Sequence, residues 1–361
     1  MNQRTVTIRA RHQGFTIVEI MIAMTLSLLL LTGIISVVAS SKITYLENER
    51  VARNQEGGRA AFEMILRDLR GAGYPGCAQP IPSLFSPNNR LTTPTSLLWH
   101  FEVPLQGYEG TSGTWAPALD AALSGATPAP STGNDVIVIR TIRAGLPQFR
   151  TTGFTNPTDD IVVAKSAGQK VVGTTFVIND CGGESFFVAT TTAADADTTA
   201  TLRRSTGGTA PTNQSKDLLA SFTQGAQVAP VDTVIYYVAP SGTPAVKGGQ
   251  AGPALWRIVS STGVPEEVIP GVERMEIKYG VDTDGDTVVD QYSDANVVDA
   301  ANNWSNVISA RIAILVRSPE PNAPGLDKRT YALFNSSAGP YNDLYERSLF
   351  ITTVTLRNRT T

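Results

Sequence analysis

Histidine and cysteine are almost absent from this sequence, and both shortages limit the chemistry it can carry. Two histidines, His12 and His100, occur among 361 residues. Nucleophilic catalysis by a serine, histidine and acid would have to use His100, which lies in an apolar run and is best interpreted as a packed side chain. The sequence contains no C-x-x-C pair, no Walker-type phosphate loop and no triad of histidines and carboxylates. We therefore expect no enzymatic activity.

Charged residues are also sparse, at 17% of the chain, and the formal net charge is −3. A general nucleic-acid binder needs many lysines and arginines for phosphate contacts. We therefore expect no direct binding of nucleic acid. Glycine, proline, serine, threonine and alanine are plentiful, a composition typical of an extracytoplasmic β-rich protein with long loops.

Against this background, one hydrophobic run near the N-terminus is conspicuous. Residues 1–14 are polar and contain three arginines but no acid, and residues 15–38 contain one charged side chain, Glu19. About 20 apolar residues suffice to cross a bilayer, and positive charge ahead of the span keeps that end in the cytoplasm. No convincing signal-peptidase site follows. Composition alone favours an uncleaved N-terminal anchor.

Glu19 is costly in such a segment, by roughly 2.5–3.5 kcal/mol at the bilayer centre, and therefore calls for a partner. The run Gly14-Phe15-Thr16-Ile17-Val18-Glu19 and the apolar residues after it resemble the class III signal of type IV pilins and type II secretion pseudopilins. The resemblance implies that a prepilin peptidase cuts between Gly14 and Phe15 and N-methylates Phe15. Glu19 is then the fifth mature residue. Because opposite charges attract more strongly at low dielectric, we interpret Glu19 as an assembly contact for the freed amine.

The helical pattern continues beyond the apolar run. Phe62, Ile65, Leu66 and Leu69 follow the i, i+3, i+4, i+7 spacing of one buried helical face. We expect one helix over residues 15–70 whose second half lies against a sheet. The glycine pair at 57–58 predicts a bend or partial melting.

The rest of the chain predicts strands and loops. We expect long loops over residues 78–132 and a mobile loop over residues 191–215. In residues 308–316 apolar side chains alternate onto one face, and residues 349–356 alternate as well; we expect the two runs to pair antiparallel. The other expected strands are 136–140, 160–163, 170–178, 185–190, 233–238, 254–259 and 274–279.

This order of elements predicts an α+β, pilin-like fold: a long N-terminal transmembrane helix packed on an antiparallel β-sheet with large loop insertions. Four further blocks, in order, resemble the PilW-type minor pilins: residues 67–77, 180–187, 271–282 and 352–359. The expected division is a leader at 1–14, a transmembrane and assembly helix at 15–40, the extracytoplasmic half of the helix at 41–73 and a β-rich head at 74–361.

Two further sites are expected. If the head is periplasmic, Cys77 and Cys181 can form a disulfide; the alternative is two buried free thiols. Asp282, Asp284, Asp286 and Asp290 stand at loop positions 1, 3, 5 and 9, a spacing that resembles EF-hand-like calcium loops. The glycine and the bidentate glutamate of an EF-hand are missing at positions 6 and 12. Calcium is therefore one interpretation, and a solvated acidic turn is the other.

The resemblance implies a PilW-like minor pilin that primes pilus assembly and sits in a tip complex. Its implied partners are the prepilin peptidase, the major pilin, other minor pilins and a PilY-type adhesin. It implies a protein of the inner membrane with a cytoplasmic N-terminus and a periplasmic head, later at the pilus tip. The alternatives are a type II secretion minor pseudopilin of the J kind and a membrane-anchored, calcium-dependent adhesive domain.

Overall fold

The computed structural model describes residues 14–73, 88–143, 145–153, 156–180, 182–189, 198–207, 211–242, 252–321, 323, 325–356 and 358. The chain divides into two compact units, residues 1–52 and residues 53–361. Helix α1 (Ile17–Gly71) contributes to both. Cys77, Cys181 and most of the predicted leader lie outside the described residues, so the disulfide stays a prediction.

In the first unit, α1 is a helix with an uncovered apolar surface. It is the described helix that is long and apolar enough to cross a membrane, and its most apolar stretch has no buried residue. The large apolar side chains from Ile17 to Val38 are exposed in the isolated chain. Such a surface requires lipid or other helices around it.

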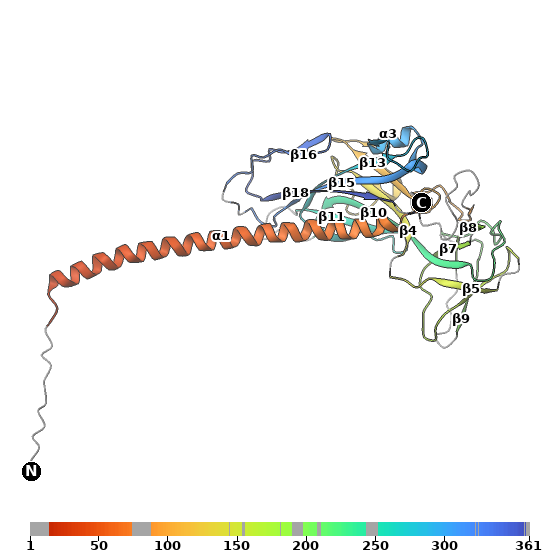
Figure 1. Ribbon diagram of the computed structural model, residues 1–361, viewed down its shortest axis with the longest axis horizontal. Coiled ribbons are helices and arrows are strands. Elements are labelled where there is room, and N and C mark those ends of the chain that lie inside the picture. Colours follow the sequence, from red (N-terminus) through yellow and green to blue (C-terminus); the bar gives the residue numbers. More distant parts are fainter. Residues whose placement is uncertain are drawn as a thin grey trace, which may run out of the picture. The chain divides into compact units, whose positions relative to one another are not determined.

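In the second unit, the last part of α1 packs into the hydrophobic core (Figure 1). The buried positions recur every three or four residues, as expected for one helical face: Asn54, Gly58, Ala61, Ile65, Asp68 and Leu69. Ile65 and Leu69 are fully buried, whereas Phe62 and Leu66 are partly buried at the margin of the core. The helix therefore lies against the sheets, as predicted. Compared with the predicted face, the buried face is rotated toward Ala61.

The predicted partial melting at the glycine pair is absent, because α1 is helical through both residues. Gly58 instead permits close packing: a Cβ atom there would lie 2.4 Å from the Phe350 ring. A Cβ atom on Gly57 would meet its nearest neighbours at ordinary contact distances of 3.7 and 3.8 Å. The two adjacent glycines therefore have different roles.

The strands form a twelve-stranded sheet, a four-stranded sheet and a two-stranded ribbon. The twelve-stranded sheet contains β1 (Asn88–Asn89), β2 (Leu105–Gly110), β3 (Trp115–Ala116), β4 (Val136–Ile142), β5 (Phe149–Gly153), β6 (Ile161–Ala164), β7 (Thr175–Asp180), β8 (Gly183–Val188), β9 (Thr199–Leu202), β10 (Gln227–Pro240), β11 (Pro253–Val259) and β12 (Glu266–Pro270). The four-stranded sheet has the order β14-β13-β15-β18, with β13 (Val272–Val281), β14 (Gln291–Ser293), β15 (Val307–Arg317) and β18 (Arg347–Thr355). The ribbon is β16 (Tyr331–Leu333) with β17 (Ser336–Ala338), and the short helices are α2 (Ala121–Ser124), α3 (Ala295–Ala300) and η1 (Trp304–Asn306).

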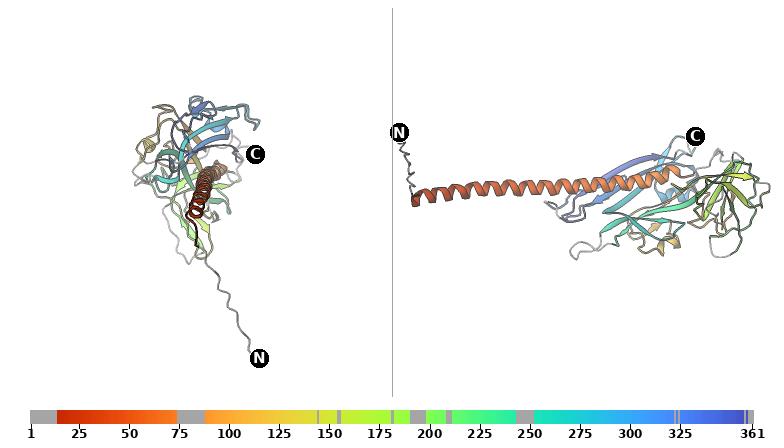
Figure 2. Two further views of the ribbon diagram at one scale, coloured as in Figure 1. Left: turned by 90° about the vertical axis from the view of Figure 1, so that its left-hand side faces the viewer. Right: turned by 90° about the horizontal axis from the view of Figure 1, so that it is seen from below.

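Strand β10 connects two parts of the large sheet. Its first residues, from Gln227 to Pro230, pair with β5 and β7, and the rest pairs with β4 and β11. Along the second part, alternate side chains enter two different cores, so the strand is buried on both faces. Strands β5 to β9 enclose a core of their own, which we call the small lobe (Figure 2).

The four-stranded sheet confirms the clearest strand prediction. Strand β15 pairs antiparallel with β18 from Ser309↔Thr355 to Arg317↔Arg347, and its predicted apolar face joins α1 in the main core. The segment between the two strands is more than a polar loop. Its ribbon, β16 with β17, covers Ala313 and Leu315 on the outer face of β15.

Two predictions about loops and one about the start of a strand were wrong. Residues 78–132 contain β2, which lies beside β4 within the sheet, and residues 191–215 contain β9, which pairs with β6. The strand expected over 170–178 begins only at Thr175. Glycine, glutamate and threonine in these strands gave a weak signal because sheet propensity depends on tertiary partners.

Candidate functional site

The start of α1 holds the predicted processing and assembly residues. Gly14, Phe15 and Thr16 precede the helix in an exposed, non-helical stretch, and Phe15 is 82% exposed. The bond between Gly14 and Phe15 therefore lies outside regular structure. A peptide bond in such a segment is not enclosed by the hydrogen bonds of a helix.

Glu19 caps the helix on which it stands. The Thr16 backbone N–H donates to Glu19 Oε2 at 3.4 Å, and the Glu19 backbone N–H donates to Thr16 Oγ1 at 3.3 Å. This reciprocal pair is a capping box, which satisfies two N–H groups that the first helical turn leaves open. The capping role is additional to the predicted assembly role, and the Thr-x-x-Glu spacing is the sequence signal for it.

Three hydrogen bonds hold the C-terminal end of the helix within the second unit. The Tyr236 hydroxyl of β10 donates to the buried Asp68 carboxylate at 2.6 Å. The Asn358 amide donates to the carbonyl oxygens of Arg70 and Ala72 at 3.2 and 3.1 Å. These residues fix the helix C-terminus to β10 and to the chain end, and the periodicity of the sequence does not show their pairing.

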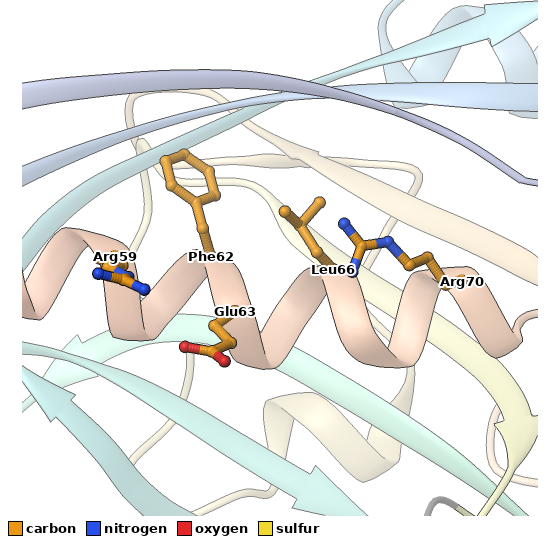
Figure 3. A pocket seen from close by; sticks show the side chains of 5 residues that line it. All are labelled: Arg59, Phe62, Glu63, Leu66 and Arg70. Atoms are coloured by element: carbon orange, nitrogen blue, oxygen red, sulfur yellow. The ribbon is translucent and has the colours of Figure 1, made fainter.

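A shallow cavity of about 310 Å³ lies on the outer side of α1 (Figure 3). Phe62 and Leu66 line it together with the charged side chains Arg59, Glu63 and Arg70. These two apolar residues were predicted to be on the buried face, and their partial exposure gives this side of the helix a mixed apolar and charged character.

The acidic loop gathers three of its four predicted carboxylates. One oxygen each from Asp282, Asp284 and Asp286 lies within 4.8 Å of the others. Backbone N–H groups of the loop also bind them: those of Gly285 and Thr287 donate to Asp282 at 2.7 and 2.9 Å. The carboxylates are thus brought together by the turn, with lone pairs remaining for a cation.

Asp290 is not part of this group. Its carboxylate accepts hydrogen bonds from the Thr283 hydroxyl and backbone N–H at 2.5 and 2.7 Å. The hydroxyl contact and then the N–H contact lower the pKa of Asp290. Asp290 therefore closes the loop, and the other three carboxylates are the candidate calcium ligands.

His100, the histidine left after the predicted cut, is half-buried. Burial lowers its pKa, and the nearby Arg140 lowers it further. Both effects favour the neutral imidazole.

Comparison with protein families gives two matches. The prokaryotic N-terminal methylation motif matches residues 9–35, which include the predicted cut and Glu19. The family described as type IV pilus-assembly protein W matches residues 235–358, which contain the second part of β10, β11, β12 and the whole four-stranded sheet. The predicted blocks at 67–77 and 180–187 lie outside this match.

The search of curated proteins and the search of solved structures gave no match. The assignment therefore depends on the two family matches and on the fold that agrees with them: a long apolar N-terminal helix followed by a large β-sheet domain. Taken together, they support a PilW-family protein of the type IV pilus with a class III prepilin-like signal.

Proposed function

We propose that this chain primes type IV pilus assembly and forms part of a tip complex with other minor pilins and a PilY-type adhesin. The PilW family is a structural component of the pilus and not an enzyme family. The observation that carries the proposal is the PilW match over the C-terminal sheet, in a chain that also has the methylation motif. A secretion pseudopilin of the J kind would share the motif, but the match to a pilus-assembly family favours the pilus.

In the proposed pathway, the helix enters the inner membrane with its N-terminus in the cytoplasm and the head in the periplasm. The prepilin peptidase cuts between Gly14 and Phe15 and methylates the new amine. The exposed, non-helical conformation of these residues supports this step. Removal of the three leader arginines lowers the formal charge of the chain from −3 to −6.

Glu19 then neutralises a terminal amine during assembly. Its carboxylate lies 3.4 Å from the Thr16 backbone nitrogen, and Thr16 directly follows Phe15. The capping box therefore already holds the negative charge close to the place where cleavage creates the positive one. Inside a bundle of apolar helices the attraction is stronger than in water, so the pair would favour packing with a neighbouring pilin.

Complementation of a strain that lacks this subunit tests the proposal. We expect the wild-type chain to restore piliation, and Glu19→Ala to be inserted and cleaved but to restore few pili. Glu56→Ala is the matched control, because Glu56 is an exposed acid of the same helix beyond the apolar stretch. Mass spectrometry of the mature N-terminus reports cleavage and methylation separately from assembly.

Two outcomes would contradict the proposal. Normal piliation with Glu19→Ala would remove the assembly role of the carboxylate. A mature protein that still begins at Met1 in a strain with active peptidase would contradict the processing step.

The acidic loop supports a second property, calcium binding by the head. The gathered carboxylates of Asp282, Asp284 and Asp286 favour it, and the alternative adhesive function would depend on it.

A further inference from the structure

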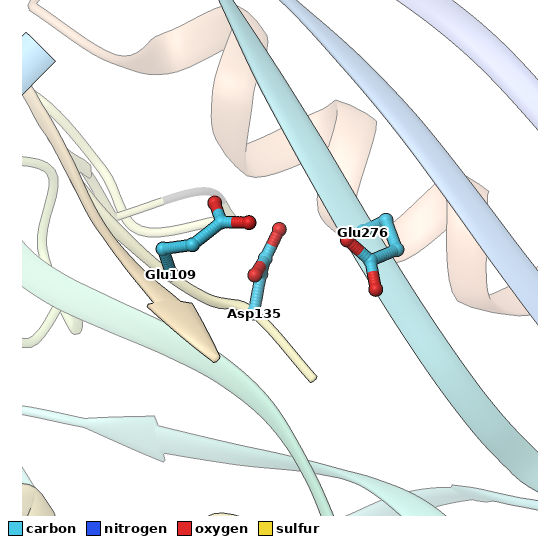
Figure 4. A group of neighbouring side chains, drawn as sticks. All are labelled: Glu109, Asp135 and Glu276. Atoms are coloured by element: carbon cyan, nitrogen blue, oxygen red, sulfur yellow. The ribbon is translucent and has the colours of Figure 1, made fainter. Parts of the chain in front are cut away.

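A second group of three acids, separate from the acidic loop, lies between the two sheets (Figure 4). Glu109 belongs to β2, Asp135 directly precedes β4, and Glu276 belongs to β13. One carboxylate oxygen from each lies within 4.8 Å of the other two. Asp135 and Glu276 are buried, at 1% and 4% exposure.

Asp135 joins the two sheets. Its carboxylate accepts from the Gly110 N–H of β2 at 3.0 Å and from the Ile277 N–H of β13 at 2.7 Å. Its own N–H donates to the Met275 carbonyl at 2.9 Å. Each carboxylate oxygen has two lone pairs, so these bonds leave Asp135 able to bind a cation. The group is therefore held in place by the backbone of both sheets.

Two positive charges nearby are already paired, one of them with Glu276 of this group. Arg274 pairs with Glu276 at 2.6 Å, and Lys278 pairs with Asp294. Within the described part of the chain, neither Glu109 nor Asp135 forms an ion pair. Burial, and then the charges of Glu109 and Glu276, raise the pKa of Asp135 well above its usual range. Glu109 and Asp135 thus lie side by side without an ion pair, and ionising both of them there without a counter-charge would be costly at low dielectric.

Polar atoms without partners point to the same place. Tyr279 is fully buried, and its hydroxyl has no hydrogen-bond partner. A Cβ atom on Gly107 would meet this hydroxyl at 2.0 Å, and Gly107 shares its face of β2 with Glu109, two residues further along. Asp135 and Glu109 are the charges that act on the Tyr279 hydroxyl. Glu109 Oε2 is also buried and unpartnered. A bound water or ion would satisfy these buried polar groups.

We propose that Glu109, Asp135 and Glu276 bind one calcium ion between the two sheets of the head. Calcium takes oxygen ligands at about 2.3–2.6 Å in flexible geometry, so two ligands on opposite sides of the ion lie about 5 Å apart. The three carboxylate oxygens lie within 4.8 Å of one another, which is compatible with that span. The ion would supply the missing counter-charge and would link β2 to β13. A shared proton is the competing way to neutralise the group.

The test uses the full-length chain in detergent micelles, treated with EDTA, in an Asp284→Asn background that disables the acidic loop. We expect calorimetry to show one calcium ion per chain and the thermal midpoint to rise with calcium. Adding Glu109→Gln, which keeps the shape and removes one charge, should weaken calcium binding by about tenfold or more, because calcium affinity follows the charge of the ligands. Glu109 is only partly buried, so this variant should remain folded.

Three outcomes would overturn the proposal. The Asp284→Asn chain could bind no calcium, or it could bind calcium with the same affinity after Glu109→Gln. In the third outcome, calcium would have no effect on stability. Stability would instead fall steeply as the pH rises through the raised pKa of Asp135, and Glu109→Gln would make that fall less steep. This last result would show that a proton neutralises the group.

Discussion

The two neighbouring glycines of α1 allow a sharp test of how the helix packs on the head. In a helix interior, alanine is more favourable than glycine by about 0.8–1.0 kcal/mol. At Gly57 the added methyl group would contact Val316 and Ile269 at 3.7 and 3.8 Å, which is ordinary packing. Gly57→Ala should therefore stabilise the protein by about 1 kcal/mol.

Gly58→Ala should have the opposite sign. The same methyl group would lie 2.4 Å from the Phe350 ring, so the ring or the helix has to move by about 1 Å to reach normal contact. Overpacking of this kind costs about 1–3 kcal/mol, which equals or exceeds the gain in helix propensity. The expected net effect is a loss of about 0–2 kcal/mol.

Thermal unfolding of the full-length protein in detergent, followed by tryptophan fluorescence, measures both variants. A change of 1 kcal/mol shifts the midpoint by about 2 °C in a domain of this size. Phe350→Leu opens space beside Gly58, so the Gly58→Ala substitution should cost less in that background than in the wild type. If Gly58→Ala raised the midpoint as much as Gly57→Ala, the proposed contact between α1 and β18 would be wrong.

Three other predictions concern the head. Arg347→Met should lower the free energy of unfolding by about 3–5 kcal/mol in a denaturant titration, because it leaves the carboxylates of Glu273, Asp327 and Asp343 without their buried partner. Arg329→Met, at the half-exposed edge of this network, should cost under about 1 kcal/mol in the same titration, and equal losses would contradict the reasoning. Calorimetry should show one more calcium ion bound by the wild-type chain than by Asp284→Asn, and identical stoichiometry would leave the acidic loop a plain turn. Burial raises the pKa of Glu184 to about 7, so its contribution to stability is present at low pH and is lost as the pH rises through 7; Glu184→Gln should remove this part of the pH dependence of the thermal midpoint, and an unchanged profile would refute it.

The sequence predicted the elements that have a strong local signal. The 55-residue helix follows from the apolar run and the spacing after it, and β15 with β18 follows from strict alternation. The capping box was readable as well, from Thr16 and Glu19 three residues apart. In each case the residues that decide the structure are near neighbours in the chain.

Features that depend on distant residues could not be predicted in this way. Asp135 and Ile277 are brought together by the meeting of two sheets, and no local pattern marks either residue. The same holds for Arg347, whose acid partners come from β13 and from the segment before β18. Gly58 was misjudged because propensity describes an isolated helix, whereas its role is set by the Phe350 ring.

The continuity of β10 has a mechanical consequence for any subunit that carries a load. Gln227–Pro230 belongs to the small lobe and the following residues to the main core, so one unbroken backbone crosses from one to the other. Tension applied at the small lobe is therefore transmitted along covalent bonds into the strand whose Tyr236 holds α1. A force applied to that lobe would therefore act on helix α1 without first separating an interface between domains.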